Sequence, residues 1–100
     1  MHLVTERTLR RYAAKHPVVT SSVDRWIVAL RAGEWATMDE VVRAFANSKA
    51  INGDRARFQI SGGDYRLIVS FNFGRQWAFV KFIGTHAEYD RIDAATVAQF

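Results

Sequence analysis

The chain has 100 residues, 49% of them hydrophobic and 24% charged, which predicts one globular domain over residues 1–100 and excludes an intrinsically disordered chain. It contains no cysteine, which excludes disulfides and thiol chemistry, and its three histidines lack zinc-like spacing, so we expect no metal site and no cofactor. The formal net charge of +4 favours an anionic partner such as nucleic acid without specifying one.

The chain has no apolar run of about 18 residues that could cross a bilayer. Its first residues, MHLVTERTLRR, place the charges after a very short apolar start, which is the reverse of a signal peptide. We therefore expect a cytoplasmic protein without a membrane partner.

The first helix is indicated near the N-terminus. Residues 2–4 could form a short strand, and Thr5 after them is a potential N-cap. Apolar residues then follow at helical spacing over residues 6–16, and Pro17 ends this pattern.

Two further helices follow before the middle of the chain. Ser22 can cap a second helix whose apolar positions repeat at helical spacing as far as Gly33. The letters TMDE match a capping box between Thr37 and Glu40, which opens a third and shorter helix. The N-terminal half is therefore predicted to be helical.

From Ala56 onward the apolar residues alternate with polar ones. Three segments show this period of two, namely ARFQIS, YRLIVSFNF and WAFVKFI, and short connectors with glycine separate them at 62–64 and 74–76. We predict an α+β fold with a small antiparallel sheet. It consists of a three-strand C-terminal meander, with residues 2–4 as a candidate additional strand, and the N-terminal helices pack on one face.

The alternation gives this sheet two different faces. The apolar one, expected to take the helices, carries Phe58, Ile60, Leu67, Val69, Phe71, Val80 and Phe82. The other is polar and basic and carries Arg57, Gln59, Arg66, Ser70, Asn72 and Lys81. Trp77 and Phe79 share the parity of Lys81. The second face is either an ordinary solvated surface or a platform for single-stranded RNA, whose bases stack on aromatic rings.

A polar cluster, THAEYD, follows the last predicted strand. It has a structural interpretation, in which Thr85 caps a turn, His86 bonds backbone, Tyr89 packs inward and Asp90 pairs with Arg91 or caps the next segment. It also has a chemical interpretation, because RNA cleavage without a metal needs a base, an acid and cations beside the phosphate.

Each role in that reaction can be filled from this sequence. His86 and Tyr89 are candidate proton-transfer groups, and Arg66 and Lys81 are candidate cations beside the reacting phosphate. The flanking RNA would be held by Arg55, Arg57 and Trp77. The same residue types could equally form a binding face that does not cut.

The segments EWATMDEVVRAF, FQISGGDYRLIVSFNF and FVKFIGTHAEYDRID, in that order, resemble the HigB family of toxins from type II toxin–antitoxin modules, within the RelE-like superfamily. The opening HLVTERTLRRYAAKHP is also similar to that family. The resemblance implies an mRNA interferase that cuts translated messages at the ribosome. It also implies a HigA-type antitoxin with a helix-turn-helix domain.

The resemblance carries site residues over by position. It assigns Arg66 from YRL, Lys81 from VKFIG, and His86 and Tyr89 from THAEYD to the active site. One departure is the turn Gly62-Gly63-Asp64, where the family often has Gly-Asn followed by a basic or polar residue. An aspartate there would repel a phosphate. Two alternatives therefore stay open: a binding module that does not cleave, and a degenerate toxin that retains only antitoxin binding.

Overall fold

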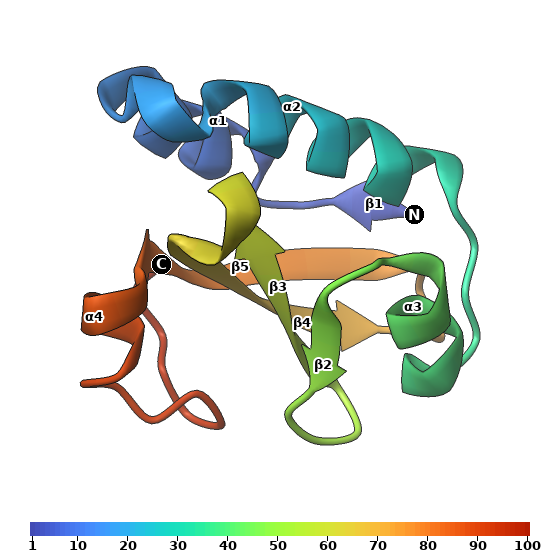
Figure 1. Cartoon of the computed structure of the whole chain (residues 1–100). Helices are drawn as coiled ribbons and strands as arrows, with labels where there is room; N and C mark the ends of the chain where they lie inside the picture. Colours follow the sequence, from blue (N-terminus) through green and yellow to red (C-terminus); the bar gives the residue numbers. More distant parts are fainter.

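A five-stranded sheet in the order β1-β5-β4-β3-β2 forms the centre of the computed structural model, which describes residues 1–100. Its strands are β1 (His2–Leu3), β2 (Ser48–Ala50), β3 (Arg55–Ile60), β4 (Tyr65–Asn72) and β5 (Trp77–Thr85). The helices are α1 (Glu6–Lys15), α2 (Pro17–Ala32), α3 (Met38–Ala44) and α4 (His86–Tyr89). In Figure 1, α1 and α2 form a layer over one face of the sheet, and α4 lies on its other side.

The predicted α+β class is confirmed, and the three predicted strands are β3, β4 and β5, paired antiparallel. The candidate N-terminal strand also exists, but β1 pairs parallel to β5, so the sheet is mixed. Strand β2, which pairs antiparallel with β3, was not predicted. With only three residues, it is too short for alternation to be recognised.

The second helix begins earlier than predicted. Pro17 occupies its first turn, after His16 at the N-cap position, so Ser22 lies inside the helix and does not cap it. Proline suits this position because its fixed φ is already helical and its missing N–H would have had no partner. The additional turn also packs on the core through Val19, which is buried. Although α2 is the longest helix, neither it nor any other helix is long and apolar enough to cross a membrane.

The other two predicted helix N-caps, Thr5 and Thr37, have different outcomes. The capping box between Thr37 and Glu40 is present at the start of α3. The Thr5 hydroxyl makes no cap hydrogen bond and instead accepts one from the Val80 N–H at 2.7 Å. Thr5 therefore ties the start of α1 to the edge of β5.

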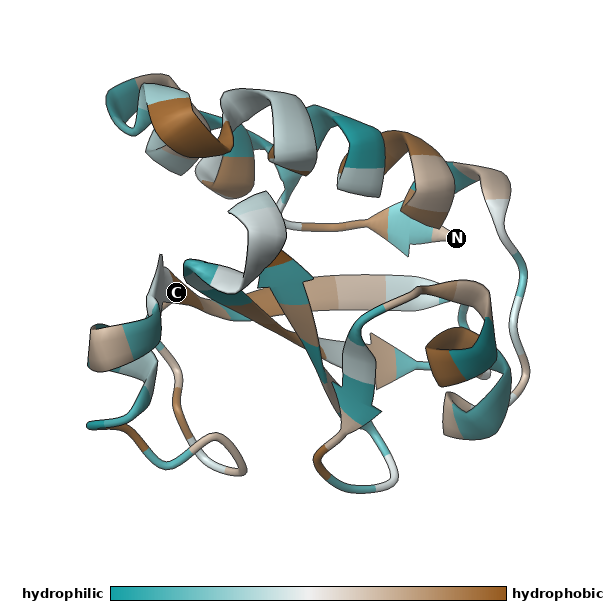
Figure 2. Ribbon diagram, viewed as in Figure 1, coloured by the Kyte–Doolittle hydropathy of each residue, from teal (hydrophilic) through white to brown (hydrophobic).

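The hydrophobic core lies between the helical layer and the sheet. Helix α2 contributes Val19, Val23, Trp26, Ile27 and Leu30, all of them buried. Figure 2 shows hydrophobic residues along the central strands and hydrophobic and hydrophilic residues alternating along α2. This alternation lets α2 bury one stripe and leave the opposite side in water.

A β-bulge in β5 changes the predicted assignment of faces. Val80 pairs with Val69 and Phe82 with Ile68, which leaves Lys81 as the additional residue between two paired positions. An additional residue reverses the parity of everything after it. The prediction that Phe82 lies on the helix-covered face was therefore wrong: it lies beside Ile68 on the outer face, and Ile83 enters the core.

The outer face of the sheet is also less open than a solvated surface would be. Ile68 and Phe82 are 0% and 6% exposed although they lie on that face. The C-terminal residues cover it, because an Nη1 of Arg55 donates to the carbonyl oxygens of Ala94 at 3.1 Å and Val97 at 2.8 Å. The polar face is therefore divided into a covered part and an open part.

Gly33 ends α2 as predicted, but not through a left-handed conformation, since its φ is −97°. Its missing side chain makes room for Trp35, because a Cβ on Gly33 would lie 2.1 Å from the Trp35 ring.

Gly33→Ala should lower the free energy of unfolding by about 1–3 kcal/mol through overpacking, measured by urea titration. Gly53→Ala is the matched control, since a Cβ there meets nothing within 4 Å. Equal stability of the two variants would contradict this account.

Candidate active site

The corner where β5 meets α4 is held by two local interactions. The Thr85 hydroxyl accepts a hydrogen bond from the Glu88 N–H at 3.1 Å, and the Glu88 carboxylate accepts one from the Thr85 N–H at 2.8 Å. The backbone bond from Thr85 is the main reason that the pKa of Glu88 lies below its ordinary 4.5. The His86 N–H donates to the carbonyl of Asp64 at 2.9 Å, which fixes α4 against the turn between β3 and β4.

His86 points a reactive group into solvent at this corner. Its side chain is 54% exposed, and its Nδ1 lies 3.0 Å from an Asp90 carboxylate oxygen. When the carboxylate accepts from Nδ1, the other ring nitrogen is free to exchange a proton with a substrate. The pairing of His86 with Asp90 was not predicted. The sequence suggested that His86 bonds backbone and that Asp90 pairs with Arg91 or caps the next segment. Spacing of i and i+4 on a short helix was the available signal.

Arg66 is the other unusual group here. It lies on the outer face between Gln59 and Gly84, and it is only 8% exposed. Its guanidinium donates to the carbonyls of Gly63 and Tyr65 and forms no ion pair with a carboxylate. A buried cation is costly unless it is paired. Arg66 thus keeps guanidinium N–H donors for an anion that arrives from outside.

Tyr89 lies at this corner, whereas Lys81 lies earlier on β5. Tyr89 belongs to α4, and its half-buried ring packs 6.3 Å from that of Phe82. Lys81 is the bulge residue of β5, and its Nζ lies 5.6 Å from the centre of the Phe79 ring. The structure therefore gathers Arg66, His86 and Tyr89 where β4 begins and β5 ends, with Lys81 earlier on β5.

The three predicted RNA-binding residues lie in three different environments. Arg57 is half-buried in the middle of the outer face, and its Nε is buried without a hydrogen-bond partner. Arg55 is engaged with the C-terminal carbonyls, a structural role that the sequence did not indicate. Trp77 begins β5, roughly 26 Å from Thr85 by the rise per residue of a strand. The Cζ of Arg75 lies 5.0 Å from the centre of the Trp77 ring. Only Arg57 lies on the outer face near Arg66 without a competing contact.

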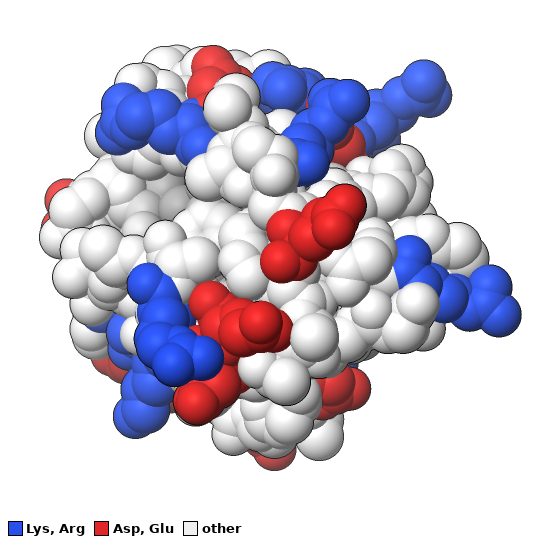
Figure 3. Space-filling view, turned by 90° about the vertical axis from the view of Figure 1, so that its right-hand side faces the viewer, with Lys and Arg blue, Asp and Glu red and all other residues white.

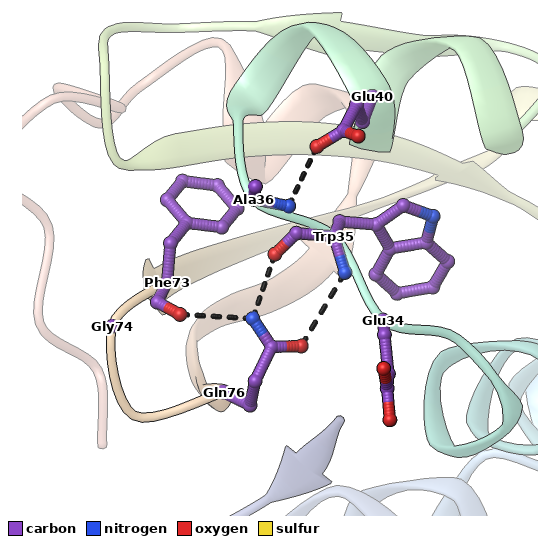
Figure 4. A pocket seen from close by; sticks show the side chains of 7 residues that line it. All are labelled: Glu34, Trp35, Ala36, Glu40, Phe73, Gly74 and Gln76. Carbon is purple, nitrogen blue, oxygen red and sulfur yellow. Dashed lines mark hydrogen bonds between the residues drawn. The ribbon is translucent and has the colours of Figure 1, made fainter.

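The larger of the two pockets lies elsewhere, between the α2–α3 connection and the turn from β4 to β5. It has a volume of about 570 Å³, and Gln76 crosses it by donating to the carbonyls of Trp35 at 2.7 Å and Phe73 at 2.8 Å (Figure 4). Its walls include Glu34 and Glu40. Backbone hydrogen bonds from Ala36 and Thr37 hold the pKa of Glu40 below its usual value, so this carboxylate stays charged at neutral pH.

The charges around that pocket do not suit a polyanion. On the side of the molecule seen in Figure 3, acidic side chains lie near the centre and also at the edge, with basic side chains beside some of them. Two carboxylates that line the same pocket repel phosphate groups. Elsewhere, no three His, Cys, Asp or Glu side chains lie close enough together to hold a metal ion. The corner around Arg66 and His86 is therefore the better candidate for chemistry on RNA.

Comparison with known proteins decides the family. The profile of the HigB toxin family, described as the RelE-like toxic component of a toxin–antitoxin system, matches residues 19–92. The chain belongs to this family. It is also 26% identical over 94 residues to the mRNA interferase HigB of Escherichia coli O6:H1 (strain CFT073), covering 92% of this chain and 91% of that protein.

This result confirms the resemblance drawn from the sequence. The matched range includes all four candidate catalytic residues, Arg66, Lys81, His86 and Tyr89. As a member of a toxin family, the chain has an antitoxin as its partner. The roles of the individual residues stay predictions.

The capping box of α4 should make a contribution to stability that depends on pH. Glu88→Ala should lower the free energy of unfolding at pH 7 by about 0.5–1 kcal/mol, the low part of the range for caps because the carboxylate is exposed. A folded pKa below 4.5 means that this contribution is present above pH 4.5 and is lost as pH falls through the folded value. Urea titrations at pH 7 and in acid measure it.

Glu34→Ala is the matched control, because Glu34 is exposed and accepts no hydrogen bond. Its difference from the wild type should be small at both pH values. A Glu88→Ala difference that is the same at neutral and acid pH would contradict a charged carboxylate in the cap.

Proposed function

We propose that this toxin is an mRNA endoribonuclease that works without a metal ion. The observation that carries the proposal is Arg66, a buried cation with no carboxylate partner, at the corner where α4 presents His86. An anion with several oxygens, such as a phosphate of RNA, satisfies such a guanidinium. The name of the curated relative, an mRNA interferase, supports RNA as the substrate.

In the proposed reaction the 2′-hydroxyl of a nucleotide attacks the adjacent phosphate. A bond forms between the 2′-oxygen and phosphorus, and the bond from phosphorus to the 5′-oxygen breaks. One group takes the proton of the hydroxyl and another gives a proton to the departing oxygen. His86 and Tyr89 are the two proton-transfer groups, and Arg66 and Lys81 stabilise the charge that builds on the phosphoryl oxygens.

Partners and location complete the proposal. The resemblance to HigB toxins supports messages on translating ribosomes as the substrate and a HigA-type helix-turn-helix antitoxin as the inhibitor. Translated messages place the protein in the cytoplasm. Arg57 binds RNA next to the reacting phosphate, because this half-buried cation lies on the outer face two register positions from Arg66 and forms no ion pair. Trp77, with Arg75 beside it, supports RNA at the far end of β5.

The rival function is a surface that binds RNA or protein without cutting it. The position of Lys81 favours this alternative, since Lys81 lies in the bulge and not at the corner with His86. In that case the RNA would bind with a strong salt dependence and no new RNA ends would form.

Mapping cellular mRNA 5′ ends after brief induction without antitoxin separates the two functions. The wild type should produce new ends within coding regions, and His86→Ala should reduce them about 10²- to 10⁴-fold, which is the usual contribution of a proton-transfer group. His2→Ala, an exposed histidine on β1, is the control and should cut normally. Ends that persist in His86→Ala would remove His86 from the mechanism. Their absence from the folded wild type would favour the rival.

Arg66→Lys tests the cation at the corner. Lysine keeps the charge but loses the planar fork of donors, so cleavage should fall about 10²- to 10³-fold. Arg43→Lys, on the exposed side of α3, is the matched control. Thermal melting shows whether each variant folds. A folded Arg66→Lys protein that cuts like the wild type would show that Arg66 has only a structural role.

A further inference from the structure

The smaller pocket lies between α1 and the C-terminal residue and has no role in the proposed chemistry. It has a volume of about 240 Å³ and is lined by Thr8, Arg11, Tyr12, Lys15 and Phe100. Gln99 binds the edge of β5: its N–H donates to the carbonyl of Lys81 at 2.9 Å, and its side-chain oxygen accepts from the Ile83 N–H at 2.9 Å. These bonds hold Phe100 near β5, between α4 and the helical layer (Figure 1).

Two aromatic rings form walls of this pocket. The Tyr12 ring is stacked on the His16 ring, with centroids 3.9 Å apart and planes 11° apart. His16 is fixed in turn, since its Nδ1 lies 2.9 Å from the Tyr12 carbonyl oxygen. Phe100 is 42% exposed, although it is large and hydrophobic. The pocket therefore offers one ring that is already held in place and one that is open to a flat ligand.

The same pocket carries two free cations. Arg11 and Lys15 lie at i and i+4 on α1, both are exposed, and neither forms an ion pair. Arg10 on the same helix differs, because it binds Glu6 at 3.0 Å and Asp24 at 3.0 Å. No acidic residue lines the pocket. Its chemistry is thus opposite to that of the larger, glutamate-lined pocket.

The environment of Tyr12 links this pocket to α4. Burial raises the pKa of Tyr12 to about 12, and the negative charge of Glu88 adds to the effect. Tyr12 therefore remains a neutral phenol at physiological pH, and a neutral ring does not repel RNA. Glu88 belongs to α4, the helix that carries His86, so its electrostatic effect on the Tyr12 hydroxyl means that Tyr12 lies near α4.

We propose that this pocket binds one nucleotide of single-stranded RNA flanking the cleaved phosphate, with the base stacked against Tyr12 and Phe100 and a phosphate held by Arg11 and Lys15. Aromatic rings beside Arg and Lys are the general means of binding unpaired bases and their backbone. The pocket is smaller than the roughly 300–1,000 Å³ that encloses a drug-sized ligand, so it suits one ring system. The subsite rests on the proposed function, because it places this nucleotide next to the reaction.

The stacking surface is tested by Tyr12→Leu, with Tyr12→Phe as the conservative control. The probe is a fluorescein-labelled single-stranded oligonucleotide with 2′-deoxy sugars, which lacks the attacking hydroxyl and measures binding alone. Tyr12→Leu should bind it roughly 5- to 150-fold more weakly, and Tyr12→Phe should bind it like the wild type. Equal affinity of wild type and Tyr12→Leu would overturn the subsite, as would a wild type that does not bind the oligonucleotide.

The two cations are tested independently, in case Tyr12→Leu does not fold. The double variant Arg11→Gln, Lys15→Gln changes only exposed side chains. The slope of log affinity against log salt should become shallower by about 0.7 for each phosphate that the variant no longer neutralises. Arg10→Gln, which removes a cation already paired with acids, should keep the wild-type slope. A slope unchanged in the double variant would overturn the phosphate contacts.

Two results separate this subsite from the proposed function. If the pocket variants lose oligonucleotide binding while the wild type produces no RNA ends, the subsite stands and the nuclease function fails. If the wild type cuts mRNA and Tyr12→Leu cuts and binds equally well, the subsite alone fails. Weaker antitoxin binding by Tyr12→Leu with unchanged oligonucleotide binding would assign the pocket to the antitoxin and overturn the proposal.

Discussion

The β-bulge at Lys81 is the constraint that shapes the candidate site. Because Lys81 is an additional residue, Phe82 lies outward beside Ile68 and Ile83 enters the core. The register after the bulge places Gly84 directly opposite Arg66. A side chain at Gly84 would meet the Phe82 ring at 2.7 Å and a Glu88 oxygen at 3.1 Å, so glycine allows α4 to turn back at this point. Bulges commonly bend a strand and redirect side chains near functional sites.

The covering of the outer face by the C-terminal residues follows from the same bulge. Phe82 would be exposed on that face, and instead it is buried with Tyr89 packed near it. Arg55 secures this cover through two backbone carbonyls, which turns a potential RNA contact into a structural one. The cover leaves His86 in solvent at one end and ends in Phe100 beside α1. The reactive side chain that remains exposed, His86, therefore lies at the end of β5.

Charge is distributed so that the two ends of the molecule offer different surfaces. Unpaired cations lie near the end of β5, with Arg66 in the sheet and Arg11 and Lys15 on α1. Carboxylates line the larger pocket at the turn from β4 to β5, where Glu34 and Glu40 lie. The corner at the end of β5 also holds the carboxylates of Glu88 and Asp90, so the preference for a polyanion there depends on these individual cations and not on an excess of positive charge. A toxin that must bind both RNA and an antitoxin can use such separate surfaces.

Local signals were enough to predict many elements from the sequence: helical spacing, the capping box at Thr37, the alternation of the three long strands, and the motifs that indicated the HigB family. Long-range pairing decided the rest. The bulge at Lys81 and the contacts of Arg55 and Thr5 depend on partners far along the chain. Strand β2 pairs with the nearby β3, but its three residues are too few for alternation to be recognised. The sequence could name Arg66 and His86 as candidates, but the packing of the folded chain is what leaves Arg66 buried without a carboxylate. Such isolation results from the surroundings of a side chain, which no spacing in a sequence specifies.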